Sequence, residues 1–386
     1  MRAALIILDV LEDGSVPEIA GKTIAERQLL FAREAGCEAI IAFGGGGSPT
    51  AIALRHAAER YGLRYQSITS AHALAGSIGS GDTLLVLQPD LLPEARQGLE
   101  LIQAEGQRVL ILSAGPGVAG GFERIDLDRA WAGVLTIPGN ALGRLTALPE
   151  DAAPHAALLR IALQQRLPEA RLADDLLNDG RWSVIADGEM ARLREGTWFR
   201  THLPAAVPTM PSRWLARELI AKAGVWLVQR RGSRFISGTL FGLLTAGGVA
   251  AAWLEMPILA FALIALGVPV GEAFLALSRL AVAPFGKIAR LPKLRYLSDI
   301  ALFVTGVLVI DSLAHRTFFP PLVLAASLLL LDRDRLPQPF APLRDRGVMA
   351  GFLALLSTII APETSIIAVG ACALLANVAV GAIKRG

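Results

Sequence analysis

The chain has 386 residues, more than a single hydrophobic core usually organises, so at least two domains are expected. Hydrophobic residues make up 53% of it, charged residues 18%, and the mean hydropathy is +0.50, which argues against a wholly soluble protein. The charges divide unequally, because residues 1–234 carry 25 basic and 26 acidic side chains, whereas residues 235–386 carry 12 and 8. The composition therefore predicts a soluble domain followed by a sparsely charged membrane domain.

Three further features narrow the class of protein. Cys37 and Cys372 lie far apart, which argues against both a disulfide framework and a cysteine-based zinc site. Arginine supplies most of the positive charge, with no basic run that would indicate a nucleic-acid partner, so none is expected. The apolar run at residues 3–8 is too short for the core of a signal peptide, so we expect the soluble domain to stay in the cytoplasm.

Alternating apolar runs and amphipathic stretches predict an α/β domain over residues 1–205. A strand at residues 3–8 is followed by a helix at 24–35, which Gly36 ends, and by a second strand at Ala39–Phe43. The later predicted elements are helices at 50–60, 71–76 and 93–104, and strands near Tyr65, at Thr83–Leu87 and at Arg108–Leu112. This order is typical of a doubly wound, mostly parallel sheet, which binds ligands at the carboxyl ends of its strands.

The remainder of the chain predicts an all-α membrane domain over residues 235–386. Apolar segments suggest six spans, at about 235–254, 257–277, 296–313, 318–331, 347–361 and 364–383. Arginine and lysine concentrate in the segments that share a side with the soluble domain, and the opposite connections carry only Arg316. By the positive-inside rule this predicts a multi-pass protein of a bacterial inner membrane, with the soluble domain and both termini cytoplasmic.

A linker at residues 206–234 joins the two domains. Its segment 210–232 interleaves Trp214, Leu215, Leu219 and Trp226 with arginine and lysine. We interpret it as an amphipathic helix at the membrane surface, in contact with the bilayer, and the alternative is a linker helix packed on the soluble domain.

Two segments of the soluble domain resemble the sugar nucleotidyltransferases. The first is Pro17–Ile24, which contains Gly21 and Lys22 and leads into a helix, and the second is Leu84–Asp90, a strand that ends in an aspartate. The resemblance implies cofactor binding by Gly21 and Lys22 and a metal-binding role for Asp90. The glycine-rich phosphate loop of that family is replaced here by Asp9–Gly14, whose three carboxylates repel phosphate. Alternatively, Asp90 caps the next helix, which Pro93 would begin.

A glycine run between a predicted strand and a predicted helix offers a second place for an anion. Residues 44–49 read Gly-Gly-Gly-Gly-Ser-Pro, and the amides of Gly45 and Gly46 could bind a cofactor phosphate. A flexible loop without a ligand is the alternative.

The membrane domain, with an amphipathic helix before six spans, resembles the CDP-alcohol phosphatidyltransferases. Their signature, Asp-Gly-x2-Ala-Arg-x8-Gly-x3-Asp-x3-Asp, is reduced here to Val270-Gly271-Glu272 and Asp299. The resemblance implies catalytic roles for Glu272 and Asp299, a metal-binding role for Asp299, Mg²⁺ as the cofactor, and a CDP-linked lipid or sugar alcohol as a partner. Asp299 and Arg295, one helical turn apart, could instead form a structural pair.

Two hypotheses of function follow. The first is a protein of phospholipid headgroup biosynthesis with an eroded catalytic signature, and the second is a catalytically silent scaffold or regulatory partner of an active enzyme. A transporter is less favoured, because the spans carry few charges and show no repeat. Small residues around Gly247 and Gly248 permit close helix approach, either in the homodimer that the resemblance implies or within one copy.

Overall fold

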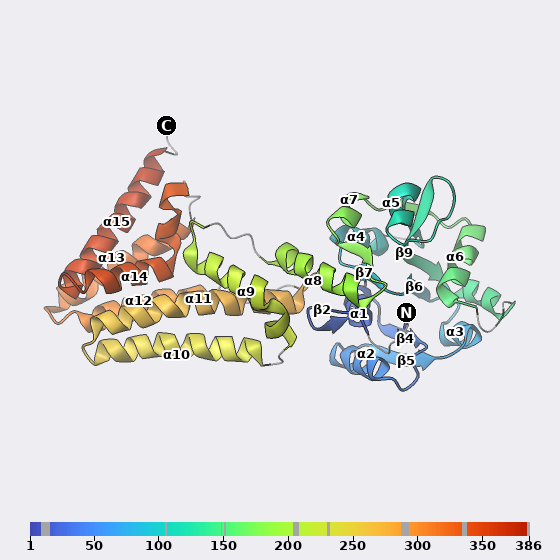
Figure 1. Cartoon of the computed structure of the whole chain (residues 1–386), viewed down its shortest axis with the longest axis horizontal. Helices are drawn as coiled ribbons and strands as arrows, with labels where there is room; N and C mark the ends of the chain where they lie inside the picture. Colours follow the sequence, from blue (N-terminus) through green and yellow to red (C-terminus); the bar gives the residue numbers. More distant parts are fainter. Residues whose placement is uncertain are drawn as a thin grey trace. The chain divides into compact units, whose positions relative to one another are not determined.

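The computed structural model describes residues 1–8, 16–104, 106–147, 149, 152–203, 208–229, 232–286, 293–333 and 338–383. The chain divides into two compact units, Met1–Trp198 and Phe199–Gly386. Figure 1 shows the strands gathered in the first unit and helices α9 to α15 in the second. This division lies a few residues before the boundary that the sequence predicted, and residues 9–14, where the nucleotidyltransferase phosphate loop would fall, lie outside the described residues.

A seven-stranded sheet forms the centre of the first unit. In spatial order its strands are β10 (Glu169–Arg171), β8 (Val109–Ser113), β9 (Arg129–Pro138), β6 (Thr83–Leu87), β1 (Arg2–Ile7), β4 (Ala39–Phe43) and β5 (Arg64–Ile68). The pairs β6–β1, β1–β4, β4–β5 and β10–β8 are parallel, whereas β9 runs antiparallel to both of its neighbours. The predicted α/β domain with a largely parallel sheet is therefore confirmed.

The helices of the first unit alternate with its strands along the chain. They are α1 (Ile24–Glu34), α2 (Pro49–Arg60), α3 (Ala71–Ser77), α4 (Arg96–Gln103), α5 (Ala114–Ala119), α6 (Pro154–Gln164), α7 (Asp175–Asn178), α8 (Gly188–His202) and the 3₁₀ helix η1 (Gly139–Ala147). Thr23 and Glu26 form a reciprocal capping box that starts α1, and Ser48 caps α2 ahead of Pro49. The helix predicted at 93–104 begins later, because Leu91–Pro93 forms β7 and pairs with β11 (Trp182–Val184).

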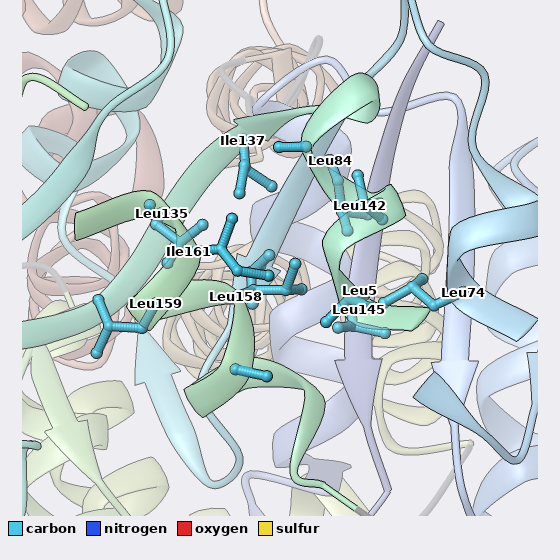
Figure 2. Close-up of a cluster of buried hydrophobic side chains, with 14 of the residues drawn as sticks. Leu5, Leu74, Leu84, Leu135, Ile137, Leu142, Leu145, Leu158, Leu159 and Ile161 are labelled. Carbon is cyan, nitrogen blue, oxygen red and sulfur yellow. The ribbon is translucent and has the colours of Figure 1, made fainter. Parts of the chain in front are cut away.

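One face of the sheet carries a continuous apolar core. Alternate residues of β1 and β6 point to this face, where they meet the side chains of α3, η1 and α6. Figure 2 shows Leu5 of the sheet beside Leu145, and Leu84 of the sheet beside Leu142, both on the covering helix η1. At about 25 cal/mol per Å² of buried apolar surface, such a cluster is the main source of the unit's stability.

A buried polar network joins α1 to the end of the first unit. The Arg27 guanidinium donates to Glu94 Oε1 at 2.6 Å and to the carbonyl of Ile19, and it stacks over the ring of Trp198. Trp198 in turn donates to the same Glu94 oxygen at 2.8 Å. Burial lowers the pKa of Arg27 from its ordinary value, and the ion pair with Glu94 opposes that shift. The network ties α8 to the β-hairpin before α1.

The second unit is helical, as predicted. They are α9 (Pro211–Gln229), α10 (Ser233–Trp253), α11 (Pro257–Val282), α12 (Lys293–Val309), α13 (Ala314–Arg333), α14 (Arg346–Leu356), α15 (Pro362–Ile383) and the 3₁₀ helix η2 (Gln338–Arg344). Among the described residues, four helices are long and apolar enough to cross a membrane: α10, α11, α13 and α15. By contrast, α12 has 17 residues and α14 only 11.

Close packing within the second unit depends on glycine. A Cβ atom on Gly248 of α10 would lie 2.7 Å from Ile264 Cγ1 and 2.9 Å from the carbonyl oxygen of Ala260, both in α11. Gly248 therefore allows α10 and α11 of the same copy of the chain to pack closely. Such a contact within one copy was one of the two alternatives given for this segment. Homodimer formation stays a prediction.

Candidate functional site

A polar pocket lies within the second unit, where the first residues of α9, α12 and α14 meet the middle of α11 and the last turn of α13. Its cavity volume is about 40 Å³, and it opens in part to the surroundings. Its lining comprises Met210, Ser212, Arg213, Phe241, Val268, Gly271, Glu272, Leu275, Arg295, Ser298, Asp332, Arg344, Asp345 and Arg346. Four arginines and three carboxylates share this small space, so the arrangement of their charges determines what the pocket can bind.

Arg346 is the most heavily bonded of these arginines. Its guanidinium meets both oxygens of Asp299, at 2.7 and 3.2 Å, and both oxygens of Asp332, at 3.1 and 2.8 Å. The backbone carbonyls of Leu328 and Arg344 accept further hydrogen bonds from it. The side chains of Arg346 and Asp299 are only 6% and 8% exposed, so each neutralises a charge that would be costly if buried alone.

Glu272 is paired with two arginines from different helices. Its Oε1 lies 3.3 Å from Arg213 Nε and 3.3 Å from Arg295 Nη2. One carboxylate therefore serves two guanidinium groups, which leaves an excess of one positive charge on this side of the pocket. Both arginines remain more than one third exposed, so they can also reach an anion that enters.

Asp345 holds two helices together at the edge of the pocket. It accepts hydrogen bonds from the amides of Gly347 and Val348 at the start of α14, and from the amide and hydroxyl of Ser212 at the start of α9. A Cβ atom on Gly347 would lie 2.3 Å from the Ser212 hydroxyl, so only glycine permits this approach. The predicted amphipathic segment is therefore a helix, and it is anchored within the second unit.

Helix α9 has both buried and exposed apolar side chains. Ala216 and Ile220 are buried, and α9 packs on α11 and α14. Trp214, Leu215 and Leu219 are 40%, 44% and 57% exposed. An exposed apolar stripe beside a buried one is compatible with contact between α9 and lipid.

The two predicted catalytic residues lie at this pocket but are bonded differently from expectation. Glu272 lines it directly, whereas Asp299 lies behind Arg346. Asp299 pairs with Arg346 from α14, 47 residues away, and Arg295 pairs with Glu272. The suggested Asp299–Arg295 pair is accordingly not what the structure contains.

These carboxylates do not fit a magnesium ion. Mg²⁺ requires an octahedral set of oxygen ligands, and here both oxygens of Asp299 accept from a guanidinium while Glu272 Oε1 faces two. Among the described residues, no group of three or more histidine, cysteine, aspartate or glutamate side chains is arranged to hold a metal. The guanidinium of Arg346 occupies the position between Asp299 and Asp332 where a cation would otherwise lie.

In the first unit, two of the predicted features lie along the same edge of the sheet. Gly45 and Gly46 follow β4, and Asp90 follows β6, with β1 between these strands. Strands two places apart are separated by roughly 10 Å. Gly44, Gly45 and Gly46 all have positive φ, and a Cβ atom on Gly45 would lie 2.9 Å from Leu8 Cδ1. The loop therefore needs glycine for its conformation, whether or not it binds an anion.

The remaining predicted residues of the first unit have local structural roles. Ala20 and Gly21, both with positive φ, form the two-residue turn between β2 (Glu18–Ile19) and β3 (Lys22–Thr23). The amide of Ala20 donates to Glu195 at 2.8 Å, which fixes this hairpin to α8. Asp90 adopts a left-handed conformation and its carbonyl accepts from the amide of Ile185, so it forms a turn between β6 and β7 and does not cap α4.

Several residues of the pocket were not identified as site residues from the sequence. Arg213, Arg344 and Arg346 contributed to the predicted topology only as basic residues outside the spans, and Asp332 and Asp345 had no role in any prediction. A usable signal was present in the Asp345-Arg346-Gly347 triplet directly before an apolar helix, because a cap followed by a small residue permits a close helix contact.

The sequence and the structure were also compared with those of known proteins. No protein-family model matches the sequence, and no curated protein is significantly similar to it. Among solved structures, a UDP-glucose pyrophosphorylase from Acinetobacter baumannii matches with a TM-score of 0.38 and 13% identity. The match covers 57% of this chain and 99% of that protein.

Proposed function

We propose that this chain is a membrane protein of phospholipid headgroup metabolism that binds a phosphate-bearing headgroup in the pocket without transferring it. The proposal joins the resemblance of the second unit to the CDP-alcohol phosphatidyltransferases with the pairing of its carboxylates. The proposal also includes six membrane-crossing helices, a cytoplasmic first unit and a location in a bacterial inner membrane.

The position of Arg346 is the main observation in favour of a protein that binds the headgroup but does not catalyse its transfer. Metal-dependent transfer from a CDP-alcohol needs carboxylates that hold a divalent cation and one that deprotonates the acceptor hydroxyl. In this chain Asp299 is satisfied by Arg346, and Glu272 is held between two arginines. A carboxylate whose oxygens already face fixed guanidinium groups has fewer free lone pairs with which to hold a metal ion or accept a proton from an acceptor hydroxyl.

Binding of an anion is favoured by the same charges. Arg213 and Arg295 come from different helices, share one carboxylate and are partly exposed to the pocket. A phosphate group can accept charge-assisted hydrogen bonds from both guanidinium groups while Glu272 keeps them in place. The scaffold or regulatory role then follows from binding a headgroup without consuming it.

Calorimetry on the purified full-length protein distinguishes a catalytically silent binding protein from an active transferase. We expect glycerol 3-phosphate to bind without Mg²⁺, and the double substitution Arg213→Gln and Arg295→Gln to weaken binding at least tenfold. Arg279→Gln is the matched control, because Arg279 is exposed and does not line the pocket. Release of CMP from a CDP-alcohol that requires Mg²⁺ and is lost in Asp299→Asn would overturn the silent form and restore the enzyme.

A further inference from the structure

A second groove lies at the other end of the membrane unit, between the first turns of α13 and α15. Its cavity volume is about 680 Å³, it is open to the surroundings, and its walls include His315, Arg316, Phe319, Glu363 and Ile367. Arg316 is separated from Asp332 by 16 residues of the same helix, or about 24 Å of helical rise. Because the hydrocarbon core of a bilayer is about 30 Å thick, the groove and the arginine-rich pocket lie near opposite membrane surfaces.

The groove contains one positive and one negative side chain that do not meet. Arg316 lies on α13 and Glu363 on α15, and neither forms an ion pair with any described residue. Arg316 was also the only basic residue predicted for the connections on this side. Two separated, opposite charges at a membrane surface match a ligand that itself carries two separated, opposite charges.

The walls beneath these charges are apolar and face outward. Phe319 and Ile367 are 66% and 49% exposed and line the groove together with Pro320. On a span, exposed side chains of this kind contact acyl chains. The first-turn amides of Glu363 and Thr364 have no acceptor among the described residues, and such amides at a helix N-terminus favour an anion close to Arg316.

We propose that this groove binds one zwitterionic phospholipid of the phosphatidylethanolamine type. Its phosphate accepts from Arg316 and its primary ammonium donates to Glu363, while one acyl chain lies along Phe319 and Ile367. Glu363 favours ethanolamine over choline, because a primary ammonium has three N–H donors and a quaternary one has none. It also disfavours an anionic glycerol headgroup, which offers no cation to the carboxylate. This site is independent of the ligand proposed for the arginine pocket.

Native mass spectrometry of the full-length protein in detergent, titrated with lipids of identical acyl chains, tests the proposal. We expect phosphatidylethanolamine to be retained about tenfold better than phosphatidylcholine or phosphatidylglycerol. Arg316→Gln should reduce retention of all three lipids, whereas Glu363→Gln should remove only the preference for ethanolamine. Arg234→Gln, at an exposed position outside the groove, is the matched control and should change neither.

Three results would overturn the assignment. The first is equal retention of the three lipids by the unmodified protein, which would mean a non-selective lipid-facing groove. The second is a loss in Arg234→Gln equal to that in Arg316→Gln, which would reflect only net charge. The third is displacement of the lipid by soluble phosphoethanolamine at similar concentration, which would show that the acyl chain contributes nothing. Circular dichroism of each variant checks that the fold is retained.

Discussion

Removing Arg346 should reveal how strongly the second unit depends on its buried ion pair. Arg346→Met keeps much of the volume but leaves Asp299, only 8% exposed, without the guanidinium that neutralises it. Breaking one partner out of a buried pair typically costs about 3–5 kcal/mol, because the other charge remains desolvated. For a unit of this size each kcal/mol shifts the melting temperature by about 2–4 °C, so we expect a loss of roughly 10 °C.

Two companion variants make this expectation specific. Adding Asp299→Leu to Arg346→Met removes the stranded charge, and most of the lost stability should return, since apolar replacements of buried pairs are often neutral or stabilising. Asp332→Asn is the control, because Asp332 is 33% exposed and its contribution should be about 1 kcal/mol or less.

The assay is the temperature at which the protein in detergent loses its monodisperse gel-filtration peak, compared across variants at one heating rate. If Arg346→Met is no less stable than Asp332→Asn, or if the double variant is as unstable as the single one, the reasoning about this pair is wrong.

Three further predictions concern other parts of the chain. Asp345→Ala removes the cap of α14 and the contact with α9, so it should cost about 2–4 kcal/mol, measured by the same thermal assay, with Asp345→Asn intermediate. Glu94→Leu strands the buried Arg27 guanidinium and should lower the stability of the first unit by about 3–5 kcal/mol, whereas Arg27→Met combined with it should recover part of that loss, as chemical denaturation followed by tryptophan fluorescence can measure. Burial raises the pKa of the Cys37 thiol to about 12, so the thiol should resist a thiol reagent at neutral pH until the protein unfolds; because the unfolded thiol ionises near pH 8.5, its contribution to stability should fall as pH rises from there towards 12.

The elements that local pattern determines were predicted well. β4 and β6 have the bounds that their apolar runs indicated, and α1 begins at Ile24, as predicted, and ends at Glu34. The helix expected at residue 93 begins at Arg96, because Leu91–Pro93 pairs with a strand about 90 residues later, and no local pattern shows that partner. Non-local pairing is therefore where the sequence analysis failed.

At the candidate site, too, the contacts between residues far apart in the sequence were not predicted. The sequence indicated Glu272 and Asp299 through their place in a resemblance, and both are at or beside the pocket. It suggested Arg295 as the neighbour of Asp299, because the two are one turn apart on a helix. The actual partner, Arg346, comes from a helix that begins 47 residues later, and only packing of α12 against α13 and α14 brings the two together.

The pairing of these charges also bears on how short helices fit a membrane. α14 has 11 residues, which span about 16 Å, roughly half of a hydrocarbon core. A helix of this length cannot carry both of its ends to the membrane surfaces, so unsatisfied polar groups at its start would be costly. Here Asp345 accepts from the first amides of α14 and from Ser212, while Arg346 donates to two carboxylates and two carbonyls. The contacts that pair Asp299 with Arg346 thus belong to the same group of bonds that satisfies the polar start of this short helix.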